Sequence, residues 1–227
     1  AKNKYMFGGK AKVPMVCRTA IGGGKGYAGQ HSQSLEAIAT QIPGLKVVAP
    51  STPADAKGML KTSIRDDNPV IFLEHQLLYG DRDVVPEGDF TVPFGKAAIR
   101  KEGTDVTIMA YSYMAKIAQQ AADLLAEKGV SAEVIDIRSL IPLDTDTIVE
   151  SVKKTNYAAV VSQAPGTGCY GEHIAFEIQQ KAFDYLDAPI ELIASYDCPP
   201  PMAPTLEEEF MPNAEKVTAR VLAMLGK

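Results

Sequence analysis

The sequence predicts an α/β protein in which mostly parallel strands alternate with helices. The first observation is the pattern itself: short apolar runs suited to buried strands alternate with segments in which apolar residues recur at helical spacing. The second is that such alternation is typical of parallel strands joined by right-handed crossovers, with helices on both faces of the sheet. The third is composition, because 46% hydrophobic and 22% charged residues over 227 positions suffice for a sizeable core without disulfide or metal cross-links.

The first block of this pattern contains three expected strands and two expected helices. A glycine-rich loop at 22–29 follows the first strand, and Ser32 is the expected N-cap of the first helix. Ser51 or Thr52 caps the second helix, with Pro53 at its first position. In chain order we expect a strand at 13–18, a helix at 32–41, a strand at 45–49, a helix from Pro53 to a turn at 66–69, and a strand at 70–73.

The second block begins after a stretch without periodicity. Gly, Asp and Pro crowd the segment from Tyr79 to Pro93, which we interpret as an interdomain linker. Beyond it the strand and helix patterns alternate more clearly, and Gly129 is the expected end of the first helix. In chain order we expect a strand at 106–110, a helix at 114–128, a strand at 132–137, a helix at 144–154, a strand at 158–162, a helix at 170–186, a strand at 190–194 and a helix at 213–225.

Charge and rare residues exclude several classes of protein. A net charge of −5 argues against a nucleic-acid binder and against electrostatic docking on a membrane, and no run of apolar residues is long enough to span a bilayer. Three cysteines without a Cys-x-x-Cys spacing indicate free thiols in a reducing compartment. Three histidines, none paired at a metal-ligand spacing, argue against a zinc site.

Three features of the first block could carry chemistry. Residues 24–29 match Gly-x-Gly-x-x-Gly, but the second strand ends at Ala49-Pro50 without the acid that a dinucleotide site requires, so we interpret the loop as mobile and placed over a site. His31 follows at the junction of loop and helix, where an imidazole could act as a general acid or base; the alternative is a capping or packing histidine. His75, after the third strand, is a second and weaker candidate.

The second block offers fewer candidates. The loop 165–168 precedes a long helix and could hold an anion, although a tight connection between strand and helix explains it better. The segment 197–201 contains three consecutive prolines and is expected to be stiff and extended, serving packing or docking.

Several motifs, in order and over nearly the whole chain, resemble the β subunit of thiamine-diphosphate-dependent 2-oxo acid dehydrogenases of the pyruvate and acetoin types. The matching segments are 13–18, 30–37, 43–50, 55–58, 64–69, 93–97, 141–144 and 183–189. The resemblance implies a partial pyrimidine-binding domain of the thiamine diphosphate fold at 1–79, a linker at 80–96 and a transketolase C-terminal domain at 97–227, an α/β domain with a mostly parallel sheet. It also implies that the family's first third lies outside this chain, so that an unpaired sheet edge and apolar surface are expected here.

The resemblance further implies an activity and its partners. The chain would be the β subunit of a decarboxylating, lipoyl-acylating component, active only with an α subunit in an α2β2 assembly and working with a lipoyl acyltransferase. Thiamine diphosphate would be shared with the α subunit, which holds its diphosphate and Mg²⁺, so no cofactor-binding residue is assigned here and the cofactor-activating glutamate is expected upstream. Pyruvate is the leading 2-oxo acid substrate; the alternatives are an acetoin dehydrogenase β subunit and a non-catalytic assembly module. The implied location is the cytoplasm, or the mitochondrial matrix in a eukaryote.

The resemblance assigns roles to two groups of residues. His31 matches the family histidine at the mouth of the active site, which implies that it donates a proton to the thiolate released from the lipoyl disulfide. A structural K⁺ site is implied on backbone carbonyl oxygens, which suit a hard cation. The matching residues are Met15, Ser63, Ile64, Asp66 and Asn68. The alternative for these residues is an ordinary helix C-terminus followed by an Asx turn.

Overall fold

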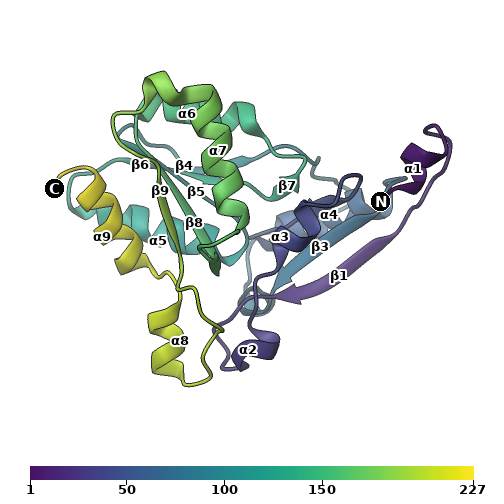
Figure 1. Cartoon of the computed structure of the whole chain (residues 1–227), viewed down its shortest axis with the longest axis horizontal. Helices are drawn as coiled ribbons and strands as arrows, with labels where there is room; N and C mark the ends of the chain where they lie inside the picture. Colours follow the sequence, from purple (N-terminus) through teal and green to yellow (C-terminus); the bar gives the residue numbers. More distant parts are fainter.

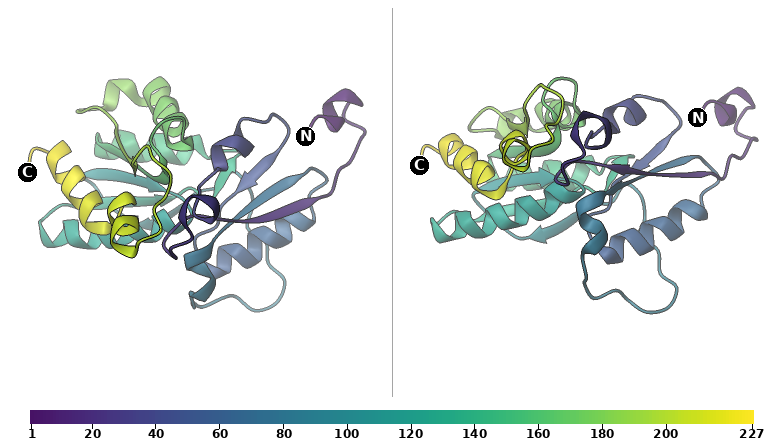
Figure 2. Two further views of the ribbon diagram at one scale, coloured as in Figure 1. Left: turned by 60° about the horizontal axis from the view of Figure 1, so that its bottom comes forward. Right: turned by 90° about the horizontal axis from the view of Figure 1, so that it is seen from below.

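The computed structural model describes residues 1–227 and confirms the predicted α/β class. A four-stranded sheet has the order β1-β3-β2-β7, and a five-stranded sheet has the order β4-β6-β5-β8-β9. Figure 1 shows the second sheet inside a broad lobe with helices on both faces, whereas β1 and the N-terminal segment extend away from it as a narrow arm. The same arrangement is seen from two further directions in Figure 2.

The first sheet is formed by three parallel strands and one antiparallel strand. Strands β1 (Val16–Ile21) and β2 (Lys46–Val48) flank β3 (Val70–His75) in parallel, while β7 (Ser139–Ile141) pairs antiparallel with β2. Helix α4 (Pro53–Ile64) packs against this sheet through a cluster that contains Met59 and Phe72. Its start is fixed as predicted, by Pro53 and by the Thr52 hydroxyl, which accepts a hydrogen bond from the Asp55 amide at 3.2 Å.

Two elements of the first block differ from the prediction. Instead of one helix at 32–41 there are two short ones, α2 (Ala28–His31) and α3 (Glu36–Thr40), and Ser32 follows the first rather than capping the second. The physical reason is that the Gln33 carbonyl accepts a hydrogen bond from the Gly22 amide, which draws this backbone into the loop. Strand β1 begins at Val16 rather than at 13, because Pro14 offers no N–H for pairing.

The second sheet contains the four predicted parallel strands, β5 (Val106–Ala110), β6 (Ala132–Asp136), β8 (Ala158–Pro165) and β9 (Glu191–Ser195). An unpredicted strand, β4 (Ala98–Lys101), adds an antiparallel edge. The helices around it are α5 (Tyr113–Glu127), α6 (Thr145–Thr155), α7 (Tyr170–Ala182), the unpredicted α8 (Pro204–Phe210) and α9 (Ala214–Met224). Shorter turns of helix are α1 (Asn3–Met6), η1 (Gln76–Gly80) and η2 (Phe183–Tyr185).

Helices on the two faces of the second sheet pack into separate cores. Helices α5 and α9 enclose one cluster, and α6 and α7 contribute to the other. The second cluster also includes Ile21, Val47 and Leu73 from the first sheet, so one continuous apolar core joins the two sheets. The predicted boundaries at 79–80 and 96–97 stay a prediction: residues 81–97 contain no helix or strand, yet β7 lies beyond them and completes the first sheet.

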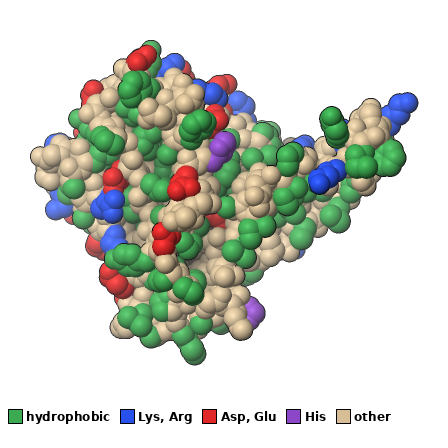
Figure 3. All heavy atoms as spheres, in the orientation of Figure 1, with side chains coloured by type: hydrophobic (Ala, Val, Ile, Leu, Met, Phe, Trp, Pro, Cys, Tyr) green, Lys and Arg blue, Asp and Glu red, His purple; other side chains and the backbone are tan.

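The narrow arm exposes an edge of the first sheet. Only β3 pairs with β1, and four of the six residues of β1 are exposed, although parallel strands are usually covered on both faces. Figure 3 shows hydrophobic side chains along this arm, where Tyr5 and Met15 are 91% and 54% exposed. Within the described chain this edge is therefore unpaired, as the resemblance led us to expect.

No helix is long and apolar enough to cross a bilayer.

Candidate active site

The glycine-rich loop is closed by a carboxylate from the other end of the chain. Its amides at Gly24 and Gly26 donate hydrogen bonds to the two oxygens of Glu207, at 2.7 Å and 2.8 Å. Both glycines have positive φ angles of 100° and 69°, which lets their N–H groups converge on one anion. The loop that we expected to be mobile is therefore held by helix α8, and its amides are not free for a phosphate.

His31 lies at the end of α2, directly after this loop. Its side chain is exposed, and its backbone carbonyl oxygen accepts a hydrogen bond of 2.9 Å from the side-chain Nε2 of Gln76. The neighbouring Ser32 hydroxyl is buried and has no hydrogen-bond partner within the chain. The imidazole is thus accessible to a ligand or a second polypeptide, which is what a proton donor requires, and its catalytic role stays a prediction.

His75 is placed very differently. It is 2% exposed, its ring is stacked on Tyr113 with centroids 4.9 Å apart, and its Nε2 lies 2.6 Å from the Gln163 side-chain oxygen. Its Nδ1 accepts a hydrogen bond from the Leu77 amide, so Nε2 carries the proton and donates to Gln163. Burial lowers the pKa of His75 to about 4, which keeps the ring neutral. The structure therefore gives this weaker candidate a packing role between the first sheet and β8.

Gly22 shows how closely this packing is fitted to the loop. It adopts a φ of +86°, and an added Cβ would lie 2.0 Å from His75 Nε2 and 2.5 Å from the Gln163 oxygen. Only a residue without a side chain allows the loop to start this close to the pair.

The structure contains a buried acid that the sequence analysis did not single out. Glu36, at the start of α3, is 1% exposed and accepts a hydrogen bond of 2.6 Å from the Tyr111 hydroxyl, which is also 3.0 Å from the Ser162 hydroxyl. Burial raises the pKa of Glu36 above its usual value, because the Tyr111 hydrogen bond offsets only part of the desolvation. The only available signal was an acid within an otherwise apolar pattern.

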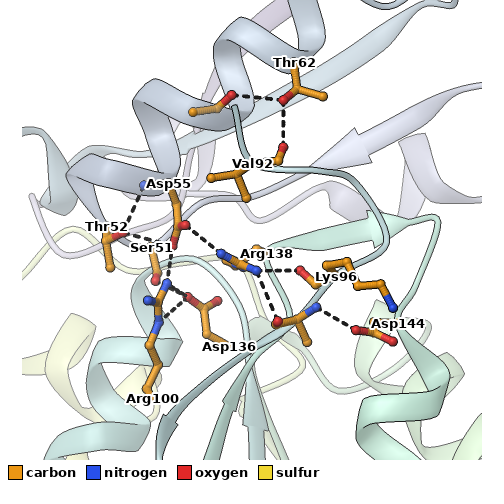
Figure 4. A network of polar contacts seen from close by, with 12 residues as sticks. Ser51, Thr52, Asp55, Thr62, Val92, Lys96, Arg100, Asp136, Arg138 and Asp144 are labelled. Atoms are coloured by element: carbon orange, nitrogen blue, oxygen red, sulfur yellow. Dashed lines mark hydrogen bonds and ion pairs between the residues drawn. The ribbon is translucent and has the colours of Figure 1, made fainter. Parts of the chain in front are cut away.

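A network of charges joins α4 to the second sheet (Figure 4). Asp55 is flanked by Arg100 and by Arg138, whose Nη1 lies 2.7 Å from the Asp55 carboxylate, while Arg100 also contacts Asp136 at 2.7 Å. Burial alone would raise the pKa of Asp55, but the two guanidinium groups outweigh it and hold that pKa below its usual value. Burial raises the pKa of Asp136, which also accepts a hydrogen bond from Ser51. Every partner is internal, so this network fixes the packing of α4.

The loop at 165–168 is also occupied from within the chain. The Thr167 amide and hydroxyl donate to the two carboxylate oxygens of Asp197, at 3.0 Å and 2.6 Å. These hydrogen bonds lower the pKa of Asp197. The structure therefore favours the tight connection over an anion site.

The three cysteines are free thiols, of which Cys17 and Cys198 are exposed and Cys169 is buried.

The carbonyl groups matched to a K⁺ site lie around the end of α4. The Met15 and Ser63 carbonyl oxygens each accept one backbone hydrogen bond, from Val70 at 2.9 Å and from Asp66 at 3.3 Å. The carbonyl oxygens of Ile64, Asp66 and Asn68 accept none from the chain, so the donor set fits a hard cation. Asp66 also forms the Asx turn, accepting from the Asn68 amide at 2.8 Å, and the K⁺ site stays a prediction.

Comparison with protein families defines the class to which this fold belongs. The family "Transketolase, pyrimidine binding domain" matches residues 1–82, and "Transketolase, C-terminal domain" matches residues 95–217. A solved structure described as a split gene transketolase, an inactive β4 tetramer, superposes with a TM-score of 0.79 over 95% of this chain and 67% of that chain. At 24% identity this likeness shows the fold alone. The two sheets are those of a transketolase-type protein.

Curated relatives define the family. The pyruvate dehydrogenase E1 component subunit β of Rickettsia felis is 48% identical over 97% of this chain and 68% of its own length. The β subunits of acetoin:2,6-dichlorophenolindophenol oxidoreductase from Cupriavidus necator and Bacillus subtilis are 47% and 45% identical over 96% and 100% of this chain. The chain belongs to this family of dehydrogenase E1 β subunits, as the motifs predicted. It spans 65% and 66% of the length of the two acetoin relatives.

Proposed function

We propose that the chain is the β subunit of the thiamine-diphosphate-dependent, decarboxylating component of a 2-oxo acid dehydrogenase complex, with pyruvate as substrate. The observation that supports this most strongly is the 48% identity to a pyruvate dehydrogenase E1 β subunit over 97% of the chain. The subunit is active only when paired with an α subunit, in an α2β2 assembly that delivers acyl groups to a lipoyl acyltransferase. It works in the cytoplasm, or in the mitochondrial matrix of a eukaryote.

Features of this chain fit a cofactor that it shares with another polypeptide. His31 is exposed, and the buried Ser32 hydroxyl next to it lacks a partner, whereas the amides of the glycine-rich loop already bind Glu207. The family resemblance assigns the diphosphate and its Mg²⁺ to the α subunit, and the filled glycine-rich loop of this chain agrees with that assignment. When bound, thiamine diphosphate supplies a carbanion for addition to the keto carbon and an electron sink for the loss of CO₂.

The contribution of this chain is a proton delivered at one atom. His31, acting as a general acid, donates a proton to the sulfur that leaves when the lipoyl disulfide is opened by acyl transfer, so that a neutral thiol departs instead of a thiolate. The exposed position of the ring at the end of α2 lets a lipoyl group carried by another protein reach it. General acid catalysis of this kind contributes about 10²-fold to 10⁴-fold to a rate.

A structural K⁺ ion forms part of the same proposal. The carbonyl oxygens of Met15, Ser63, Ile64, Asp66 and Asn68 would hold it, at the end of α4 and beside β1. Such an ion would brace the turn before β3 and would take no part in proton transfer.

A second candidate substrate is acetoin, which the two acetoin relatives favour at identities close to that of the pyruvate relative. The test is co-expression of the full-length protein with its α subunit, followed by turnover of pyruvate and of acetoin with 2,6-dichlorophenolindophenol as artificial acceptor. Pyruvate decarboxylation supports the leading proposal, acetoin turnover alone supports the alternative, and no turnover of either supports a non-catalytic assembly module.

His31→Ala tests the proton donor in the same assembly. We expect acyl transfer to lipoamide to fall about 10²-fold or more, while turnover with the artificial acceptor is partly retained, because only the first reaction opens a disulfide. His173→Ala is the matched control, since His173 is an exposed imidazole on α7. Equal retention of both activities in His31→Ala would remove His31 from the mechanism.

A further inference from the structure

Glu207 is a buried carboxylate whose only partners are backbone amides of a distant loop. It lies on α8, is 4% exposed, and accepts from Gly24 and Gly26 at 2.7 Å and 2.8 Å across a separation of more than 180 residues. Its side chain takes part in no ion pair, so these two hydrogen bonds are its polar contacts within the chain. Because both hydrogen bonds go to the loop, the Glu207 carboxylate acts on the loop and not within α8.

The loop is shaped around this carboxylate. An added Cβ at Gly23 would lie 3.0 Å from Glu207 Oε1, and one at Gly24 would lie 2.5 Å from Leu77. Glycine is therefore needed both for the positive φ angles and for the close approach of the backbone. The result is a concave pair of amides of the kind that binds anions, filled by the protein's own side chain.

The clamped loop leads directly to His31. Two hydrogen bonds hold the single turn of α2: the Gly26 amide donates to Glu207 before it, and the His31 carbonyl oxygen accepts from Gln76 Nε2 at its end. Pro199 lies close to the turn, because a Cβ added at Gly29 would lie 3.4 Å from it. Figures 1 and 2 show α2 lying beside α8 in each view. The place of the imidazole is thus set from the C-terminal region as well as from the first sheet.

We propose that Glu207 is the positioning residue of His31: by binding the amides of Gly24 and Gly26 it fixes the loop and α2, and thereby the point at which the imidazole delivers its proton. This inference rests on the proposed function of His31. It adds that helix α8, outside the pyrimidine-binding domain, controls the geometry of acyl transfer.

The test uses the full-length protein assembled with its α subunit and compares Glu207→Gln with Glu208→Gln. Glu208 is the next residue of α8, is exposed, and its side chain has no hydrogen bond or ion pair, which makes it the matched control. Glu207→Gln keeps the shape of the side chain but removes the charge, and one of its two acceptor oxygens becomes an NH₂ donor that opposes a glycine amide. We expect hydrogen exchange of the segment 22–31 to accelerate about tenfold or more, with the control unchanged.

Acyl transfer supplies the functional measurement. In Glu207→Gln we expect kcat with lipoamide to fall about tenfold, while the KM for the 2-oxo acid and turnover with the artificial acceptor stay close to wild type. In a His31→Ala background, Glu207→Gln should cause no further loss with lipoamide, because the two residues act through one step. A purely structural role of Glu207 would lower both activities together and would add to the loss of His31.

The outcomes separate the two proposals. A wild-type assembly that does not transfer acyl groups overturns the proposed function. A wild-type assembly that does, with normal exchange or normal lipoamide turnover in Glu207→Gln, overturns the positioning role alone. If Glu207→Gln does not assemble, Glu207→Asp keeps a carboxylate but shortens the side chain by one methylene, which withdraws it from the amides of Gly24 and Gly26, and it should reproduce the loss with lipoamide.

Discussion

The pH dependence of stability should reveal the buried neutral histidine. His75 has a pKa of about 4 in the folded chain, compared with 6.5 in the unfolded chain. Between these values the unfolded state binds the proton and the folded state does not, so the stabilisation from His75 is complete above pH 6.5 and is lost as the pH falls toward 4. A difference of about 2.5 pKa units corresponds to about 3 kcal/mol over the whole window.

The measurement is urea unfolding of the wild type and of His75→Gln at steps between about pH 7.5 and pH 4.5. Glutamine keeps a donor for the Gln163 oxygen but cannot titrate, so the wild type should lose about 2 to 3 kcal/mol more than the variant as the pH falls. Glu36 and Asp136, whose pKa values burial raises, are present in both proteins and cancel in the difference. A stability difference that stays constant across the window would refute the assignment of His75 as a buried neutral base.

Two substitutions test the packing around this site. Gly22→Ala should lower the free energy of unfolding in urea by about 3 kcal/mol or more, because the added Cβ would overlap His75 and the backbone φ is +86°. The control is Gly80→Ala, which has open space around it and should change the free energy of unfolding by at most about 0.5 kcal/mol. Equal unfolding midpoints for the two variants would contradict the geometry. Arg100→Met should cost about 3–5 kcal/mol, since it leaves the Asp136 carboxylate buried without its cation, and the exposed Arg65→Met should cost at most about 1 kcal/mol. A thermal midpoint of Arg100→Met equal to that of Arg65→Met would show that Asp136 is not held as a buried anion.

The sequence predicted the elements with strong periodicity. The helices expected at 114–128, 144–154 and 213–225 match α5, α6 and α9 within two residues at either end, because each presents one broad apolar face and ends at a recognisable signal. The four parallel strands of the second sheet were predicted from short continuous apolar runs, which suit strands covered on both faces.

Elements with little periodicity were missed. Strands β4 and β7 have four and three residues, too few for an alternating pattern, and their pairing depends on partners far away in the sequence. The prolines at 199–201 suggested an extended segment that hid α8, although Pro204 is a favourable first residue for a helix.

The candidate site was predicted only in part. The exposed His31 was predicted from its place directly after the glycine-rich loop. The hydrogen bonds from that loop to Glu207 could not be predicted, because they join residues more than 180 positions apart and a local sequence pattern does not relate such residues. The useful signal was that the Gly-x-Gly-x-x-Gly match lacks the acidic residue that a dinucleotide site requires. Such glycines can still surround an anion, so the sequence leaves open which anion they bind. In this protein it is a carboxylate of the chain itself.

Strand β7 restricts how the molecule can move. Because this segment returns across the linker to extend the first sheet, swinging one half of the molecule about residues 81–97 would require β7 to separate from β2 and the shared apolar core to open. Large hinge rotations of the two halves are therefore opposed by this strand pairing and by the shared core. For the same reason we expect the two fragments produced by a cut within residues 81–97 to stay associated.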